Sequence, residues 1–423
     1  MTRSLAVCAA AFLRLIAATE GFAQTPDTIK TITVPFIYEQ PSAGSAQLTL
    51  DFGAPFQKNL PTVLVIADGQ QYYVRPGAMK DLQESTFGNG VNVVGIVPRG
   101  TTPAFIKASL DSAGKPDWLR AWQIFNSREW IKDIESTRKA LVGAAGSVYL
   151  YGRSGGAYLV HEYLTEHAEH VAKVFTQSAV NPYLNAELGI TLDRFWSELY
   201  EQDPHLQLEL ATALRLYPEE RLGILTTLQR QHFYLPGEKI NEARATLIHS
   251  LAAGDLSTYK QAREKYEVDK MEAMSQTEDI IPQNVRVLEL VGPSGVFDSL
   301  GDGKIYPLAE TQAHVIQPLL ELQKAGKIKL VPFDFAALHH CTTQVFILSG
   351  RYDEAVDYRT SIALASAYPR HQLFLANDNH VFSALASSGT SKKIIAAFFG
   401  TGIGSEQLAT TLSDAQRFRW REE

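Results

Sequence analysis

A serine lies at the centre of the run Gly152-Arg153-Ser154-Gly155-Gly156. β-Favouring residues precede this Gly-x-Ser-x-Gly motif and an apolar, helix-forming run follows it. Strand, sharp turn and helix is the setting in which such a serine is exposed as a nucleophile. A loop that fits the motif by chance is the alternative, and the flanking strand and helix argue against it. We predict that Ser154 is the nucleophile and that the N–H of Gly155 binds a developing oxyanion at the helix N-terminus.

A serine hydroxyl needs a general base, and the base needs an acid that orients it. In an open α/β sheet, reactive groups gather at the carboxyl ends of the strands. The acid and the histidine should therefore follow two late strands, in that order after the serine. Asp353 follows a predicted strand at 344–348, and His380 follows one at 372–376. We predict a catalytic triad of Ser154, Asp353 and His380.

Alternatives remain open for the acid and for the base. Glu354 and Asp357 lie close to Asp353, although Asp357 also suits the first turn of the next helix as a cap. The alternative for His380 is a histidine of a surface loop. The chain has 11 histidines, and only His380 combines a strand end with the expected chain order.

The second oxyanion donor is expected in the loop after a buried strand at 62–66. Gly69 permits a tight turn there, and the N–H of Gln70 is the candidate donor. Arg153, beside the serine, has two interpretations: it contacts an acidic substrate, or it packs and pairs locally.

Three groups of residues raise the possibility of other chemistry. His161-Glu162 begins like a zinc-protease helix, but Thr165 stands where the second histidine is needed. His339-His340-Cys341 are adjacent, and adjacent side chains rarely point at one ion. Cys341 opens an apolar strand, which favours a buried structural thiol over a nucleophile. We predict no metal and no cofactor.

The N-terminal residues have the pattern of a signal peptide. A short positive start precedes an apolar run at 5–13, and Gly21-Phe22-Ala23 forms a plausible cleavage site. The run is too short to span a membrane, so no stable membrane insertion is expected. Lipidation of Cys8 is disfavoured because Val7 precedes it where a small residue is expected. We predict a signal peptide over residues 1–23 and export to the periplasm or out of the cell.

Composition and charge narrow the classes of partner. The 423 residues are 45% hydrophobic and 20% charged, as in ordinary globular proteins, and the net charge is −7. Without a basic run, nucleic acids and anionic membrane surfaces are disfavoured.

The pattern along the chain predicts an α/β fold interrupted by a helical insertion. Strands are expected at 31–38 and 47–52, as a hairpin, and at 62–66, 91–97, 148–151 and 171–177. Strand and helix alternate again at 344–348, 359–367 and 372–376, with a last helix at 381–399. The predicted domains are a first core part (24–182), a helical cap or lid (183–338) and a second core part (339–423).

These residues resemble the α/β-hydrolase superfamily, and within it the branch of prolyl and tripeptidyl aminopeptidases. The likeness is carried by residues 34–38, 133–138 and 152–156, and by the position of the helical cap. It implies the α/β-hydrolase fold, with a mostly parallel eight-stranded sheet flanked by helices, and the triad named above. The chain departs from that branch at residues 68–71, Asp-Gly-Gln-Gln in place of His-Gly-Gly-Pro, and at Gly155 in place of tryptophan. The resemblance also implies cap acids that hold a substrate amino group, for which Glu289 is the candidate.

The predicted function is a serine hydrolase that cleaves a carboxylic ester or a small peptide amide through an acyl-enzyme. A prolyl or tripeptidyl aminopeptidase-like enzyme is expected from the resemblance. A carboxylesterase or lipase-like enzyme on small acyl esters is one alternative. A non-catalytic ligand-binding protein on the same fold is another. The expected partner is a small ester or a short peptide, and the sequence does not indicate an oligomeric state.

Overall fold

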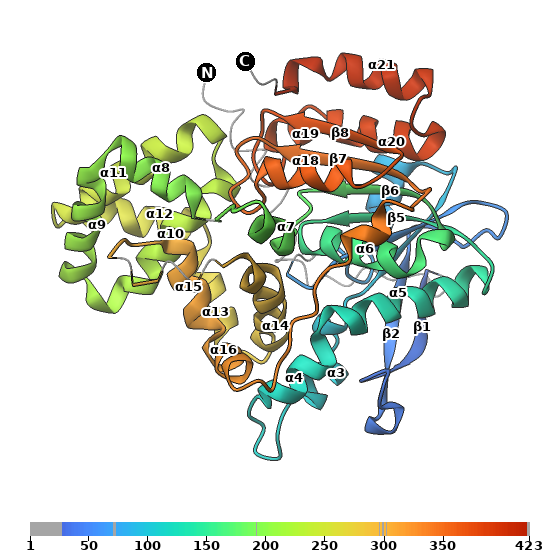
Figure 1. Ribbon diagram of the computed structural model, residues 1–423, viewed down its shortest axis with the longest axis horizontal. Helices are drawn as coiled ribbons and strands as arrows, with labels where there is room; N and C mark the ends of the chain where they lie inside the picture. Colours follow the sequence, from blue (N-terminus) through green and yellow to red (C-terminus); the bar gives the residue numbers. More distant parts are fainter. Residues whose placement is uncertain are drawn as a thin grey trace.

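The computed structural model describes residues 28–70, 73–191, 193–295, 297, 300–301 and 303–420 (Figure 1). The predicted signal peptide at 1–23, with Cys8, lies outside the described residues. Within the described part of the chain, no helix is both long and apolar enough to cross a bilayer.

Eight strands form one sheet in the order β1-β2-β4-β3-β5-β6-β7-β8. β2 pairs antiparallel with β1 and with β4, and every other pairing is parallel. The predicted fold class, an α/β-hydrolase fold with a mostly parallel eight-stranded sheet, is therefore confirmed. The strands are β1 (Ile29–Pro35), β2 (Ser45–Phe52), β3 (Thr62–Ile66), β4 (Asn92–Ile96), β5 (Val148–Arg153), β6 (Val171–Gln177), β7 (Gln344–Gly350) and β8 (His371–Ala376).

Helices cover both faces of the sheet, which explains why the central strands are continuously apolar. All five residues of β3 are buried, as expected for a strand covered on both sides. One apolar cluster joins the sheet to helices that include α5 and α6, and a second joins the opposite face to α20. The core helices are α2 (Ala78–Leu82), α3 (Pro103–Ala108), α4 (Trp118–Phe125), α5 (Ser127–Val142), α6 (Gly155–His167), α18 (Tyr358–Ser366), α19 (Ser383–Ser387), α20 (Thr390–Thr401) and α21 (Glu406–Asp414).

Between β6 and β7 the described chain is helical and has no strand. Many of these helices share an apolar cluster of their own, separate from the two clusters of the sheet, and α8 to α12 gather to one side of the sheet (Figure 1). We call this stretch the cap. Its helices are α7 (Pro182–Glu187), α8 (Arg194–Gln202), α9 (Pro204–Leu216), α10 (Arg221–Tyr234), α11 (Ile240–Ala252), α12 (Ser257–Lys265), α13 (Val268–Ser275), α14 (Ile280–Val291), α15 (Pro307–Val315), α16 (Gln317–Lys324) and α17 (Phe335–Leu338).

Short helical turns complete the described elements. They are η1 (Pro41–Ala43), the π-helical η2 (Gln83–Phe87), η3 (Arg99–Thr101), η4 (Ala168–His170), η5 (Pro218–Glu220), η6 (Gly237–Lys239), η7 (Gly292–Ser294) and η8 (Gln416–Phe418).

The predicted last helix, 381–399, is wrong in one respect. It is two helices, α19 and α20, because Gly389 between them takes a left-handed conformation with φ of 71°. Helices α2, α3, α4 and α21 were not predicted. Three of these four have eight residues or fewer, which leaves little room for a helical period to appear.

Candidate active site

The turn between β5 and α6 has the geometry of a nucleophile elbow. Ser154 has φ of 50° and is partly exposed, directly before the first residue of α6. A Cβ on Gly152 would lie 2.8 Å from the Gly156 carbonyl oxygen, and a Cβ on Gly156 would lie 2.4 Å from the Ile66 carbonyl oxygen. Only glycine allows such close approach. The predicted strand, sharp turn and helix around the serine are therefore confirmed.

His380 and Asp353 lie together at the carboxyl ends of β8 and β7. The His380 Nδ1 is 2.8 Å from Oδ2 and 2.9 Å from Oδ1 of Asp353. The fully buried carboxylate also accepts backbone N–H groups of Ala355 and Val356, each at 2.9 Å through Oδ1. These contacts fix the carboxylate, and the carboxylate in turn orients the imidazole through its Nδ1–H.

The two alternative acids have other partners. Glu354 forms an ion pair with Arg244 of α11, with Nη1 to Oε1 at 2.8 Å. Asp357 caps α18 by accepting the backbone N–H of Arg359 at 2.9 Å, as the cap interpretation expected. Of the three acids near the end of β7, the structure pairs Asp353 with His380.

The end of β6 connects the serine to the histidine. The Ser154 N–H donates to the Gln177 carbonyl oxygen at 2.8 Å, and the hydroxyl of the next residue, Ser178, donates to the His380 carbonyl oxygen at 3.0 Å. The Ser154 hydroxyl forms no hydrogen bond with any residue that the structure describes. The structure thus brings His380 and Asp353 into direct contact, and joins Ser154 to them through the backbone at Gln177 and Ser178.

The cap contacts the loops that carry both His380 and Asp353. The ring of Phe233, on α10, meets the His380 imidazole edge-on, with centroids 5.3 Å apart at 79°. The Asn379 side-chain amide donates to the Leu235 carbonyl oxygen at 3.0 Å. Sequence reasoning missed Phe233, because no local signal in a cap helix points to a loop more than a hundred residues away.

The predicted oxyanion residues have different outcomes. Gly155 is the first residue of α6, so no carbonyl within the helix is available to its N–H. Gly69 has φ of 83° and supplies the predicted tight turn. The N–H of Gln70, in contrast, donates to Oδ1 of Asp68 at 3.1 Å. The prediction that this N–H is available to a substrate is not met in this structure, because the aspartate two residues earlier captures it in an Asx turn.

Asp68 is a residue of the site to which sequence reasoning gave no role. It lies at the end of β3, is 2% exposed, and its Oδ2 has no hydrogen-bond partner among the described residues. A Cβ on Gly155 would lie 1.7 Å from this oxygen. Burial raises the pKa of the Asp68 carboxyl, and the positive charge of Arg286 on α14 opposes that rise. An acid directly after a buried strand was the signal that could have found it.

Arg153 packs locally, as its second interpretation expected. Its Nε donates to the Tyr151 hydroxyl at 2.5 Å, and its guanidinium lies over the rings of Tyr73 and Tyr151, at 5.2 and 5.3 Å.

Glu289 is buried on α14 with both carboxylate oxygens engaged. Oε1 accepts the Ser127 N–H at 2.8 Å, and Oε2 pairs with Arg286. It lines a small cavity with Ser127 and Tyr158, among other residues. The Ser127 hydroxyl donates to the nearby Glu162 at 2.9 Å. Burial, with repulsion from Glu289, raises the pKa of Glu162 to about 7.

His161 and Cys341 belong to the core. The ring nitrogens of His161 contact the hydroxyls of Tyr368 at 2.6 Å and Thr176 at 3.1 Å, and burial lowers the pKa of the imidazole to about 3. The prediction that Cys341 is a buried thiol is confirmed.

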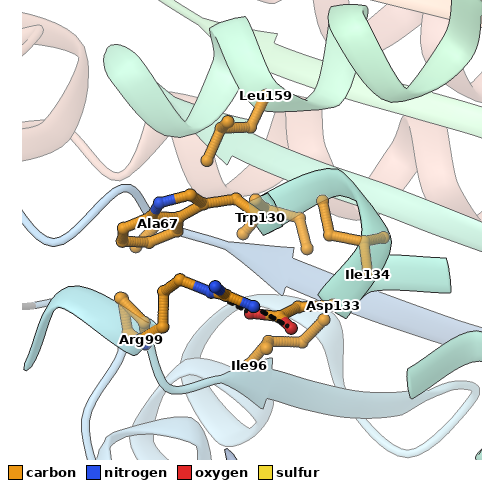
Figure 2. Close-up of a pocket in the computed structure, with 9 residues that line it drawn as sticks. Ala67, Ile96, Arg99, Trp130, Asp133, Ile134 and Leu159 are labelled. Carbon is orange, nitrogen blue, oxygen red and sulfur yellow. Dashed lines mark hydrogen bonds and ion pairs between the residues drawn. The ribbon is translucent and has the colours of Figure 1, made fainter. Parts of the chain in front are cut away.

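A second small cavity, beside the end of β3, is lined by a buried ion pair that stabilises the fold. Figure 2 shows the Arg99 guanidinium and the Asp133 carboxylate paired side by side within it, with Trp130 close by. Nε and Nη2 of Arg99 each lie 2.7 Å from an oxygen of Asp133, and Nη1 donates to the carbonyl oxygens of Phe36 and Ile124. The buried charges are satisfied by one another and by backbone, so the pair joins α5 to the loop after β4.

Comparisons with known proteins find only distant structural similarity. No protein-family model matches the chain, and no curated protein was found to be similar in sequence. Among solved structures, homoserine O-acetyltransferase from Staphylococcus aureus is similar at 15% identity with a TM-score of 0.45, covering 91% of this chain and 99% of its own. An acetylester hydrolase from Corynebacterium glutamicum has 12% identity and a TM-score of 0.39 over 88% and 96% of the two chains. MGS-M2, an alpha/beta hydrolase enzyme from a Medee basin deep-sea metagenome library, has 10% identity and a TM-score of 0.40 over 85% and 97%.

At these identities the likeness concerns the fold alone. Nothing in the comparisons distinguishes the aminopeptidase branch from other branches. On its own strand order and pairing, the chain has the α/β-hydrolase fold.

Proposed function

We propose that the protein is a serine hydrolase that cleaves a small carboxylic ester through an acyl-enzyme. The observation that carries the proposal is the contact of His380 Nδ1 with both oxygens of buried Asp353, which leaves Nε2 as the base. The elbow that holds Ser154 is bonded to the neighbouring strand, and that strand is bonded to the His380 backbone.

In the proposed reaction, the Ser154 oxygen attacks the carbonyl carbon while His380 Nε2 takes its proton. Asp353 stabilises the imidazolium that forms, and the Gly155 N–H binds the carbonyl oxygen as it becomes negative. The imidazolium then gives its proton to the leaving group. Water, activated by the same imidazole, releases the acid from the acyl-enzyme. The Ser154 hydroxyl has no hydrogen bond to a described residue, and this is compatible with the proposed reaction, since catalytic hydrogen bonds often tighten only when substrate binds.

A peptide amide with a free amino group is the second candidate, and the state of Glu289 favours the ester. An aminopeptidase needs an acid free to bind the substrate's ammonium group. Both oxygens of Glu289 are already engaged, by the Ser127 N–H and by Arg286. An ester needs no such acid.

A substrate panel tests the proposal and separates it from the alternatives. Purified wild type and Ser154→Ala are compared on p-nitrophenyl acetate and butyrate, and on N-terminal-proline and tripeptide amides. We expect Ser154-dependent turnover of the esters that exceeds turnover of the amides. Preferential cleavage of the amides would favour an aminopeptidase. Binding without any Ser154-dependent turnover would favour a non-catalytic protein and contradict the proposal.

A further inference from the structure

The carboxyl of Asp68 takes the space that a side chain would occupy at the residue after the nucleophile. Its Oδ2 lies 1.7 Å from the position of a Cβ on Gly155, and Leu290 of α14 closes the same position from the cap side at 3.0 Å. Glycine at 155 and aspartate at 68 are therefore complementary. The acid lies against the residue whose N–H is the first oxyanion donor.

The predicted second backbone donor of the oxyanion site is already engaged in this structure. The Gln70 N–H, which was expected to supply it, is held by Asp68 Oδ1 at 3.1 Å. The other oxygen, Oδ2, is buried and without a partner among the described residues. A buried polar atom with no partner is costly unless it has a ligand to meet. Its position beside Gly155 indicates that this ligand is the substrate oxygen.

The charge state of Asp68 decides whether its carboxyl group stabilises or destabilises the developing oxyanion. An ionised carboxylate would repel a developing oxyanion, whereas a neutral carboxylic acid donates a strong hydrogen bond to it. Burial disfavours the ionised form and raises the pKa of Asp68. Among the described residues, the charged or titratable groups that interact with it are Arg286 on α14, which opposes the rise, and the Tyr73 hydroxyl in the loop after β3. The Arg286 charge is shared, because the same guanidinium pairs with Glu289.

We propose that Asp68 is a catalytic residue: in its neutral form, its Oδ2–H donates the second hydrogen bond to the substrate carbonyl oxygen, beside the Gly155 N–H. This assignment rests on the proposed function. As the Ser154 oxygen bonds to the carbonyl carbon, the π electron pair moves onto the carbonyl oxygen and the Ser154 proton passes to His380. Asp68 shares its proton with the oxyanion and keeps it. When the C=O bond re-forms, the leaving group departs with the proton from His380.

Three variants test the assignment through the pH dependence of kcat/KM for p-nitrophenyl acetate, measured from about pH 5 to about pH 10. In wild type, activity should fall at alkaline pH as Asp68 ionises. Asp68→Asn keeps an N–H donor that does not titrate, so it should retain activity within about tenfold and lose the alkaline fall. Asp68→Ala has no donor and should lose about 10²- to 10³-fold in kcat. Asp51→Asn, at another buried acid with a raised pKa on β2, is the matched control and should keep the wild-type profile.

An infrared measurement gives a readout independent of turnover and of whether Asp68→Ala folds. The difference spectrum between wild type and Asp68→Asn at neutral pH should contain the C=O stretch of a protonated carboxyl group, and this band should vanish over the pH range in which activity falls. A carboxylate band at neutral pH, or an Asp68→Asn enzyme with the wild-type alkaline fall, would overturn the assignment while leaving the serine hydrolase intact. If wild type shows no Ser154-dependent hydrolysis, the proposed function fails and the assignment fails with it.

Discussion

Arg244 of the cap forms a buried ion pair with Glu354, the residue directly after Asp353. Nη1 lies 2.8 Å from Oε1, Nη2 pairs with Oε2, and the arginine side chain is fully buried. The guanidinium also lies over the Trp196 ring, at 4.3 Å. The cap is thereby attached at the backbone position that presents the predicted catalytic acid.

The first prediction concerns this attachment. Arg244→Met leaves the Glu354 carboxylate buried without its partner, and such a change costs about 3–5 kcal/mol of unfolding free energy. We expect a lower midpoint in chemical denaturation, together with a lower kcat because the Asp353 loop loses its support. The double variant Arg244→Met, Glu354→Leu removes both charges and should recover most of the lost stability. Equal stability of Arg244→Met and wild type would contradict an energetic role for the pair.

The second prediction distinguishes Asp353 from its neighbour Asp357. Asp353→Asn should lower kcat by about 10⁴-fold with the fold intact, because the amide favours the wrong imidazole tautomer. Asp357→Asn can still cap α18, since asparagine caps helices well, but it weakens the ion pairs of Asp357 with Arg194 of α8 and with Arg359. It should lower stability and keep activity within a small factor, because Asp353 retains its contact with His380. Steady-state kinetics and circular dichroism on the two variants provide the measurement. Loss of activity in Asp357→Asn alone would show that the acid is misassigned.

The third prediction concerns the glycines of the elbow. In Gly156→Ala the new methyl group would lie 2.4 Å from a backbone oxygen of β3, which cannot move without disturbing the sheet. We expect a loss of about 1–3 kcal/mol in unfolding free energy and a strong loss of activity. Gly400→Ala, in α20 with open space around it, is the matched control and should raise stability by about 0.5–1 kcal/mol. Thermal unfolding of both variants tests whether close packing, rather than glycine in general, is required.

The fourth prediction uses a buried acid of the cap. Asp193, at the start of α8, is 3% exposed, and burial raises its pKa to about 7. In the folded protein the Asp193 carboxyl keeps its proton up to about pH 7, whereas in the unfolded chain it loses the proton above about pH 4. The contribution of Asp193 to the free energy of unfolding of the wild type therefore decreases as the pH rises between these two values.

The asparagine in Asp193→Asn does not titrate in this pH range. We therefore expect the unfolding free energy of the variant, relative to wild type, to increase by roughly 3 kcal/mol between about pH 4 and about pH 7.5. Urea denaturation at several pH values gives this difference, and the value near pH 4 serves as the internal reference. A difference that does not vary with pH would show that Asp193 is ionised in the folded protein.

The placement of Ser154, Asp353 and His380 at the ends of strands could be predicted, because it follows from rules of chain order. Each comes at the end of an apolar strand, and the carboxyl ends of parallel strands meet at one edge of the sheet. The same rules did not reveal that Phe233 packs on His380 or that Arg286 acts on Asp68. The ring contact of Phe233 and the electrostatic effect of Arg286 both link the cap to the core over more than a hundred residues, and neither side chain carries a local pattern.

Gln70 shows a different failure of sequence reasoning. The glycine before it correctly indicated the turn, with φ of 83° at Gly69. The side chain of Asp68 competes for the Gln70 N–H within that turn, and this competition is decided by local geometry. The break between α19 and α20 at Gly389, in contrast, had a signal in the sequence that the prediction did not use. A glycine after two serines often marks the end of a helix.

Covalent labelling by a fluorophosphonate probe, mapped by mass spectrometry of the digested protein, tests the central claim most directly. The probe forms a stable adduct only with an activated serine hydroxyl. We predict one adduct, on Ser154, that is absent in Ser154→Ala and strongly slowed in His380→Ala. No adduct on the wild-type protein, or labelling that is equally fast without His380, would contradict the proposed hydrolase.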